Sequence, residues 1–245
     1  MLAENKVYHK TCQDGFEQIE DSSIDLVVTD PPYPMIKRGQ KGDVGGILAT
    51  DLAGDGKIFE DNDIEFEDYV PELYRVLKAE THCYIMINWN NLNELINVAK
   101  DTGFKLQNIL VWKKQNCTPS NWYMKNNEFI LMFRKGKAKP INNRGTKAIL
   151  EFDNIIRNKL HPTQKPIKLM ETLILNSTQK DETVLDPFMG SGSTAVASLL
   201  NQRNFIGFEI NEKYVNITNK RLSKIKKEYK ELITGEQNQD QLELF

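Results

Sequence analysis

Short apolar runs alternate with segments of helical spacing along most of this chain, and this alternation limits the folds that it can adopt. The expected strands are 24–29, 83–89, 106–112, 128–133, 183–185 and 204–210. The expected helices are 67–78, 92–100, 165–177, 193–200 and 211–232. Strands that alternate with helices in this way favour an α/β fold built on a doubly wound, mostly parallel sheet.

The length of 245 residues fits one substantial α/β domain and leaves little room for a second. We therefore expect a single domain over residues 1–232, followed by a flexible tail over 233–245. No apolar stretch approaches the roughly 20 residues that a membrane helix needs, and the first ten residues lack the apolar core of a signal peptide. The three cysteines are widely spaced, which indicates neither a disulfide framework nor a zinc cluster. We expect a cytoplasmic protein with no metal.

Charge is unevenly distributed along the chain, although the formal net charge is only −2. The segment from Lys113 to Lys168, called the basic sector below, carries thirteen Lys and Arg residues against three acidic residues. A concentration of positive charge of this size attracts a phosphate backbone. The basic sector therefore predicts a nucleic-acid contact, and a solvated positive face without a partner is the alternative.

The segment Asp186–Thr194, with sequence DPFMGSGST, stands between an expected strand and an expected helix. Its glycines let the backbone approach a ligand, and Ser193 or Thr194 can cap the following helix. Glu209 ends the next expected strand, where a carboxylate can take both hydroxyls of a nucleoside ribose. The full G-x-G-x-x-G pattern is absent, so the segment favours a nucleoside-bearing ligand other than a dinucleotide. A tight turn without a ligand is the alternative for the glycines alone.

A second motif, Asp30-Pro31-Pro32-Tyr33, follows the expected strand 24–29. The carboxyl end of a strand is where open α/β sheets bind ligands. After this motif the sequence from 34 to 63 is rich in Gly and Asp, and we expect a long mobile loop there. A structural turn at the end of the strand is the alternative for the tetrapeptide in isolation.

The chemistry of this tetrapeptide suits an amine acceptor. The exocyclic amino nitrogen of adenine or cytosine is a poor nucleophile, because its lone pair is delocalised into the ring. Asp30 and the carbonyl of Pro31 can each accept one N–H of that amine, which frees the lone pair. Tyr33 can stack on a base that has left the double helix.

With both motifs placed, the chain resembles the amino-methyltransferases of bacterial DNA, and in particular their β group. In that group the catalytic tetrapeptide precedes the cofactor loop, as DPPY precedes DPFMGSGST here, and the segment His161–Pro166 also looks like that group's. The resemblance covers about residues 7–222. It implies a seven-stranded, Rossmann-like sheet, S-adenosylmethionine as the methyl donor, and DNA as the acceptor. A homodimer, common among such proteins, is expected by analogy.

The resemblance also assigns roles to individual residues. The catalytic residues that it implies are Asp30, Pro31, Pro32 and Tyr33. The cofactor-binding residues that it implies are Thr11, Cys12, Asp30, Thr163, Lys165, Asp186, Phe188, Gly190, Gly192, Ser193 and Glu209, with Thr163 and Lys165 holding the methionine end. DNA would be read by a recognition region at about 112–160, and the expected DNA contacts are Lys37, Arg38, Lys113, Lys114, Lys125, Arg144 and Lys147.

Two details of the sequence bear on the cofactor and on the target base. The family commonly has an acidic residue near the N-terminus that contacts the adenine of the cofactor, and Thr11 stands at that place here. A hydroxyl can still bond the adenine amino group, but more weakly than a carboxylate. Members that act on cytosine N4 more often begin the tetrapeptide with Ser, so Asp30 favours adenine N6. The alternatives left open are cytosine N4, an RNA or protein acceptor, and a non-catalytic module that binds DNA or a clamp.

The C-terminal tail is polar and Gln-rich before it ends in the sequence QLELF. A short apolar terminus after a polar linker is typical of a docking peptide. This pentapeptide resembles the motif by which bacterial replication proteins bind the sliding clamp, through Gln241, Leu242, Leu244 and Phe245. Packing of these side chains on their own domain is the alternative.

Overall fold

The computed structural model describes residues 2–32, 64–118, 121–137, 139–155, 160 and 164–234. The expected loop over 34–63 and the possible clamp-binding residues Gln241, Leu242, Leu244 and Phe245 lie outside these described residues. Four expected site residues also lie outside them, namely Tyr33, Lys37, Arg38 and Thr163.

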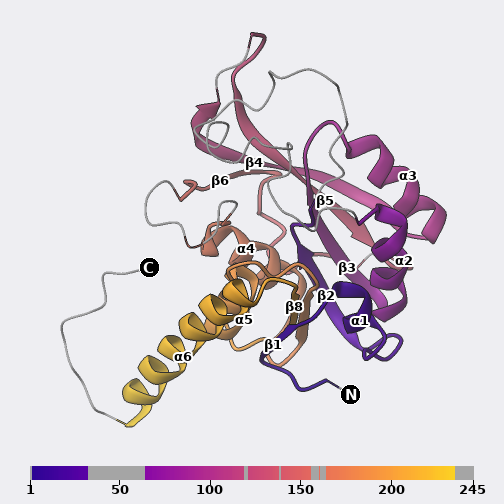
Figure 1. Ribbon diagram of the computed structural model, residues 1–245. Coiled ribbons are helices and arrows are strands. Elements are labelled where there is room, and N and C mark those ends of the chain that lie inside the picture. Colours follow the sequence, from indigo (N-terminus) through magenta and orange to yellow (C-terminus); the bar gives the residue numbers. More distant parts are fainter. Residues whose placement is uncertain are drawn as a thin grey trace.

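The elements follow one another as β1 (Lys6–His9), α1 (Cys12–Phe16), β2 (Ile24–Thr29), α2 (Phe66–Val76), β3 (Leu77–Ile87), α3 (Leu92–Thr102), β4 (Lys105–Thr118), β5 (Lys125–Arg134), β6 (Ile149–Glu151), α4 (Ile167–Ser177), β7 (Thr183–Asp186), α5 (Ser193–Leu200), β8 (Asn204–Glu209) and α6 (Glu212–Thr234). Figure 1 shows these elements in the colours of the sequence. None of the described helices is both long enough and apolar enough to cross a membrane.

The strands form one sheet in the order β1-β8-β7-β2-β3-β5-β4-β6. Every neighbouring pair is parallel except the two pairs made by β5, which runs antiparallel to both β3 and β4. The sheet is therefore mostly parallel, as the alternation of strands and helices predicts.

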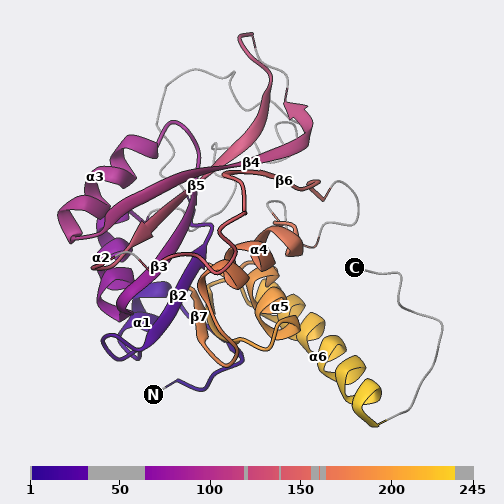
Figure 2. The same cartoon turned by 180° about the vertical axis from the view of Figure 1, so that it is seen from behind.

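Helices cover both faces of the sheet, with α1, α2 and α3 on one side and α4, α5 and α6 on the other (Figure 2). The side chains of β3 show this double winding. Cys83, Ile85 and Ile87 pack in the cluster that includes α2 and α3, whereas Tyr84 and Met86 pack in the cluster that includes α4. Successive strand residues point to opposite faces, so each strand contributes to two cores.

Local signals explain where the helix α2 begins. Glu65 and Asp68 form a capping box, in which the backbone N–H of Glu65 donates to Oδ2 of Asp68 at 2.9 Å. The apolar face of the helix is fully buried. The helix ends two residues earlier than expected, because Leu77 already pairs with Ile24 as the first residue of β3.

The sheet has eight strands among the described residues, one more than the resemblance implies. Neither β1 nor β6 is among the strands expected from periodicity. Each is four residues long or shorter and buries one side chain, Val7 in β1 and Leu150 in β6. A single buried residue produces no alternation, so the period-two pattern could not reveal these strands.

Candidate active site

The two motifs meet where the connections of the sheet change direction. The strand β2 leads through α2 to β3 on one side, and β7 leads through α5 to β8 on the other. β2 and β7 are neighbours, with Leu26 opposite Val184. Asp30 directly follows β2, and Asp186 is the last residue of β7. This is the switch point at which open α/β sheets bind ligands, at the carboxyl ends of the strands.

Asp186 is buried and holds the two strands and the glycine loop together. Its Oδ1 accepts hydrogen bonds from the hydroxyl of Thr29 at 2.8 Å and from the backbone N–H of Phe188 at 3.1 Å. Its Oδ2 accepts from the hydroxyl of Thr194 at 2.6 Å. Burial raises the pKa of Asp186 to about 6, although these three donors act in the opposite direction. Both oxygens are bound within the protein, so Asp186 fixes the shape of the loop.

The glycine loop needs backbone conformations that other residues rarely adopt. Gly190 has a φ of 53° and Gly192 a φ of 83°. A Cβ on Gly192 would lie 2.3 Å from Cγ2 of Thr218, and the hydroxyl of Thr218 donates to the carbonyl of Gly190 at 3.1 Å. The loop therefore packs closely on α6 and turns into α5 without a side chain at its tightest point.

The expected capping of α5 by Ser193 or Thr194 is wrong. Gly192 occupies the N-cap position, and no side chain there makes a capping hydrogen bond. The hydroxyl of Ser193 instead donates to the carbonyl of Lys165 at 2.8 Å, and that of Thr194 donates to Asp186. Gly192 itself takes the N-cap position in a left-handed conformation, so both hydroxyls face inwards, one towards Asp186 and the other towards the segment before α4.

Glu209 closes the opposite side of the glycine loop. Its Oε2 accepts from the backbone N–H of Gly190 at 2.7 Å, and its Oε1 accepts from the backbone N–H of Asn211 at 2.8 Å. Burial raises the pKa of this carboxyl above its usual value, while the backbone donors lower it. A carboxylate offers about four lone-pair sites, so each oxygen can still take one hydroxyl. This arrangement fits the two adjacent hydroxyls of a ribose.

Thr11 and Cys12 lie beside Glu209, because β1 pairs with β8 and His9 stands opposite Glu209. The hydroxyl of Thr11 caps α1, since it accepts from the backbone N–H of Asp14 at 3.1 Å and donates to Oδ2 of Asp14 at 2.7 Å. Burial raises the pKa of the Cys12 thiol to about 12, so this thiol stays protonated. The structure thus brings the N-terminal turn to the same place as Glu209.

Phe188 lies between the glycine loop and α2. Its ring is partly buried and meets the ring of Tyr69 edge to face, with centroids 5.1 Å apart. Tyr69 itself is fully buried. The contact holds one edge of the Phe188 ring and leaves part of this side chain accessible, as a stacking surface for a planar ligand requires.

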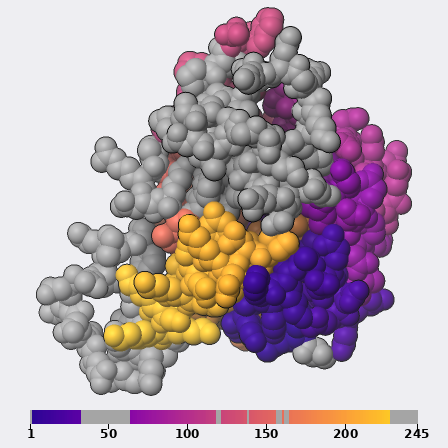
Figure 3. Space-filling model, in the orientation of Figure 1, coloured from indigo at the N-terminus to yellow at the C-terminus, as the bar shows by residue number. Residues whose placement is uncertain are grey.

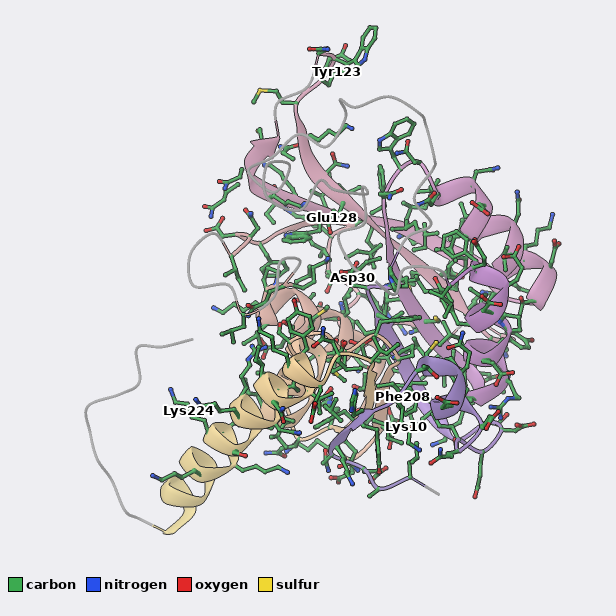
Figure 4. All side chains as sticks on the ribbon, in the orientation of Figure 1. Lys10, Asp30, Tyr123, Glu128, Phe208 and Lys224 are labelled. Carbon is green, nitrogen blue, oxygen red and sulfur yellow. The ribbon has the colours of Figure 1, made fainter. Side chains whose placement is uncertain are left out.

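Four charged side chains connect Asp30 with the hairpin formed by β4 and β5. The ammonium of Lys165 donates to Oδ2 of Asp30 and lies 3.4 Å from Oε2 of Glu128, whose Oε1 accepts from Lys114. Lys165 is 8% exposed, and Asp30 is 16% exposed. Figure 4 shows Glu128 between Asp30 and the tip of the hairpin formed by β4 and β5.

The opposite charges in this group keep the side chains of Lys165 and Glu128 ionised in spite of their burial. Burial lowers the pKa of Lys165, but the attraction of Asp30 and Glu128 outweighs it and leaves that pKa above its ordinary value. Burial likewise raises the pKa of Glu128, but the attraction of Lys165 and Lys114 outweighs it, so that pKa is lowered. Both side chains therefore remain charged near neutral pH. The ammonium of Lys165 is turned towards the carboxylate of Asp30.

The prolines of the tetrapeptide follow β2 directly. Pro31 is buried and Pro32 is partly buried, and both have the trans peptide bond before them. A proline fixes its own backbone angle and restricts the residue before it. The carbonyl groups of this segment are therefore held in a fixed orientation next to Asp30.

Two of the expected DNA contacts form ion pairs within the protein. In β4, Lys113 lies 3.1 Å from Glu151 of β6, and Lys114 pairs with Glu128 of β5. Two of the three acidic residues of the basic sector thus neutralise lysines that the sequence assigns to DNA. Lys125 lies on β5 with its ammonium 5.9 Å from the centre of the Trp89 ring.

The remaining described DNA contacts, Arg144 and Lys147, lie between β5 and β6 and are exposed. Neither forms an ion pair with a described acidic side chain. Their charges are therefore available to a phosphate backbone.

The sequence did not single out Thr29, Glu128 or Thr218, although each binds a motif residue. Thr29 and Thr218 carry ordinary hydroxyls in regular elements, and only the fold brings them to Asp186 and Gly190. Glu128 did carry a signal, because it is one of only three acidic residues in the basic sector. An acidic residue placed among many lysines indicates a specific partner.

Comparison with known proteins identifies the family. The model of the DNA methylase family matches residues 24–220. The type II methyltransferase M2.MboI of Moraxella bovis is 30% identical over 256 residues, which cover 93% of this chain and 92% of that protein. The type II methyltransferase M2.DpnII of Streptococcus pneumoniae is 29% identical, with 84% of each chain covered.

Solved structures agree with this result. The complex of M1.HpyAVI with S-adenosylmethionine has a TM-score of 0.65 and 26% identity, and the match covers 89% of this chain and 98% of that chain. The cytosine-N4-specific PvuII DNA methyltransferase shares the fold with a TM-score of 0.69 and 20% identity, over 96% of this chain and 94% of that chain. The family match covers both motifs and the residues that join them at the switch point. The chain belongs to the DNA methylase family and is an S-adenosylmethionine-dependent DNA methyltransferase.

Proposed function

We propose that this protein methylates the exocyclic N6 of adenine in DNA, at a specific sequence. The observation that carries the proposal is the position of Asp30 at the switch point, where only the strand β7 separates β2 from β8 and its nucleoside-type site at Glu209. Asp at the head of the tetrapeptide, in place of Ser, favours adenine over cytosine within this family. Sequence specificity would come from side chains of the basic sector that reach base edges in a groove.

We assign the residues that follow β2 to the binding of the target base. Asp30 and the Pro31 carbonyl would each accept one N–H of the adenine amine, which frees the nitrogen lone pair. The ammonium of Lys165 holds one oxygen of Asp30 and keeps the carboxylate oriented. When the new N–C bond has formed, the nitrogen carries an extra proton, and Asp30 is placed to accept it. Tyr33 would stack on the flipped base.

We assign the glycine loop after β7, and the residues around Glu209, to the binding of the cofactor. S-Adenosylmethionine supplies a methyl group on a positively charged sulfur, whose bond to that methyl breaks during transfer. Glu209 would accept the two ribose hydroxyls, and Phe188 would stack on the adenine. The backbone of Gly190 would allow close approach, while Thr11 would lie near the adenine amino group. Thr163 stays assigned to the methionine end.

The role of Lys165 in this proposal differs from the one that the family resemblance implies. The resemblance assigns Lys165 to the methionine end of the cofactor. Its ammonium instead pairs with two carboxylates, Asp30 and Glu128. We therefore assign it as a positioning residue for Asp30.

The test is the chemical identity of the methylated nucleoside in living cells. The protein is expressed in a bacterial host that lacks its own DNA methyltransferases, and the genomic DNA is hydrolysed and separated by mass. The proposal predicts N6-methyladenine, confined to one short sequence when the positions are mapped. Accumulation of N4-methylcytosine would show that the target base is cytosine, while the proposed mechanism would remain the same. Unmodified DNA from cells that contain folded protein would contradict the proposal and direct attention to RNA or protein acceptors.

A further inference from the structure

The hairpin of β4 and β5 extends beyond the edge of the sheet where the active site lies. Ile87, the last residue of β3, stands opposite Phe129 of β5. The residues of β5 that precede Phe129 therefore pass the end of β3, on the side to which Asp30 belongs. On that side Lys113 of β4 stands opposite Asn127 and, after a shift in register, Thr118 stands opposite Lys125. The end of this hairpin projects from the body of the molecule in both ribbon views (Figures 1 and 2).

The tip of this hairpin carries three large apolar side chains exposed to solvent. Trp122 is 91% exposed, Tyr123 is 93% exposed and Met124 is 58% exposed. The described end of the hairpin stands at the outer end of the space-filling view (Figure 3), where Tyr123 is labelled in the same orientation in Figure 4. We call these residues, 122–124, the aromatic tip. Aromatic side chains this exposed on a projecting element mark an interaction surface, because folding gains little from them there.

The root of the hairpin is tied to the active site. Glu128 of β5 pairs with Lys165, which donates to Asp30. From Glu128 to Lys125 the strand advances about 10 Å, and the aromatic tip lies further still. Figure 4 shows Asp30, Glu128 and Tyr123 in this order from the centre outwards. The aromatic tip thus projects from the same side of the sheet as Asp30.

We propose that the aromatic tip enters a groove of double-stranded DNA, where Trp122 and Tyr123 stack against the bases next to the one held at Asp30. This inference rests on DNA as the acceptor of the methyl group. A two-stranded β-ribbon fits the major groove, which is about 12 Å wide and about 8.5 Å deep. The hairpin extends beyond Glu128 by more than that depth, so its tip can reach the base edges. Stacking tolerates any sequence, since every base has a π-face.

Charge favours DNA over a protein partner for this surface. Lys125 begins β5 next to the aromatic tip, and its ammonium lies 5.9 Å from the centre of the Trp89 ring, which is itself 62% exposed. Positive side chains beside exposed aromatic rings are typical of proteins that bind nucleic acids by backbone attraction and base stacking. A flipped base leaves a gap in the stack, and an aromatic ring that fills this gap holds the base outside.

The first experiment follows the fluorescence of Trp122 without any methyl transfer. In the Trp89→Phe variant the two remaining tryptophans are Trp112, which is 2% exposed, and Trp122. Unmodified bacterial DNA, sheared to short duplexes, is added to this variant together with a non-reactive analogue of the cofactor. We expect DNA to quench the Trp122 emission and to protect it from acrylamide. Emission that stays fully accessible to acrylamide when DNA is bound would overturn the proposal.

The second experiment compares two double variants in steady-state methylation. We expect Trp122→Ala/Tyr123→Ala to raise the KM for DNA about 10- to 100-fold and to leave the Kd for the cofactor unchanged, because each lost stacking contact weakens binding. Trp122→Phe/Tyr123→Phe keeps two aromatic rings and should stay within about threefold of the wild type. The control Leu200→Ala shortens a side chain that is 45% exposed at the end of α5, and it should change neither constant.

The outcomes separate this inference from the proposed function. If the wild type methylates DNA and the double alanine variant does so with an unchanged KM, the aromatic tip does not contact bases and the function still stands. If the wild type methylates no DNA, the function fails, and the acrylamide result still decides whether the tip meets DNA. A third outcome is a wild type that is a dimer and a double alanine variant that is a monomer, with the same KM for DNA. This outcome would assign the tip to contact with a second copy of the chain and overturn the proposal.

Discussion

The ammonium of Lys165 donates a hydrogen bond to the carboxylate of Asp30, across 135 positions of the sequence. This contact joins the residue that follows β2 to a residue two positions before α4. On its other side Lys165 meets Glu128 of the β4–β5 hairpin. Asp30 is therefore connected by charge to the hairpin that we propose to face DNA.

Replacement of Lys165 separates its two candidate roles. In Lys165→Met two carboxylates lose their buried partner, so we expect methyl transfer to fall at least about 100-fold and the protein to lose on the order of 3 kcal/mol of stability. The Kd for the cofactor, measured by calorimetry, should change by less than about threefold. Lys168→Met, an exposed lysine on α4, is the control and should behave as the wild type. If the Kd for the cofactor rises by the same factor as the rate of methyl transfer falls, Lys165 binds the cofactor.

Gly192 should tolerate no side chain. In Gly192→Ala the new Cβ would meet Thr218 at 2.3 Å in a backbone conformation with φ of 83°. We expect a loss of about 1–3 kcal/mol in unfolding free energy and at least tenfold weaker cofactor binding, because the loop must move. Denaturant unfolding and calorimetry measure the two effects. Gly145→Ala, where the Cβ would meet only the side-chain oxygen of Asn143 at 3.3 Å, is the control and should be nearly neutral.

Asp186 should make stability depend on pH in a defined direction. Its pKa in the folded protein is about 6, above the ordinary 3.8, so the folded state binds this proton more tightly than the unfolded state does. Its contribution to stability is therefore largest at low pH and falls as pH rises through about 6.

The variant Asp186→Asn has an amide at this position, which does not titrate in this pH range. The unfolding free energy of the wild type minus that of Asp186→Asn should fall by about 1–2 kcal/mol between pH 5 and pH 7.5. Urea unfolding of both proteins at the two pH values gives this difference and cancels the effect of the other titrating groups. A difference that is the same at both pH values would show that burial does not perturb this carboxyl.

The salt dependence of DNA binding should distinguish the lysines and arginines by their surroundings. Arg144 and Lys147 are exposed, so each alanine variant should lower the slope of log K against log salt by about 1. Lys113 already pairs with Glu151, and its alanine variant should lower the slope by less. Lys100→Ala, on the outer surface of α3, should leave the slope unchanged. If all variants give the same slope of log K against log salt, the basic sector does not contact DNA.

Much of the fold follows from local sequence. The bounds of β2 and α5 agree with the sequence prediction at both ends, because each is an apolar run stopped by strong local signals. For β2 the signal is the pair of prolines, and for α5 it is the glycine pair. The strands β1 and β6 could not be predicted, since they depend on pairing with distant strands and bury one residue each.

The site was predicted in outline but not in its connections. The sequence locates Asp30, Asp186 and Glu209, because each ends a strand or directly follows one. It cannot reveal that Thr29 binds Asp186, or that Glu128 lies against Lys165, since both contacts join elements far apart in the chain. The exposure of Trp122 is likewise a property of the projecting hairpin. An aromatic residue in sequence is equally compatible with a core position.

The most direct test of the central claim uses purified protein, tritiated S-adenosylmethionine and unmodified bacterial DNA, with the wild type and Asp30→Asn in parallel. After digestion, the nucleosides are separated and counted, and cofactor binding of both proteins is measured by calorimetry. The account predicts label in N6-methyladenine with the wild type, and no label with Asp30→Asn although this variant binds the cofactor normally. Label in another nucleoside, or full activity of Asp30→Asn, would contradict it.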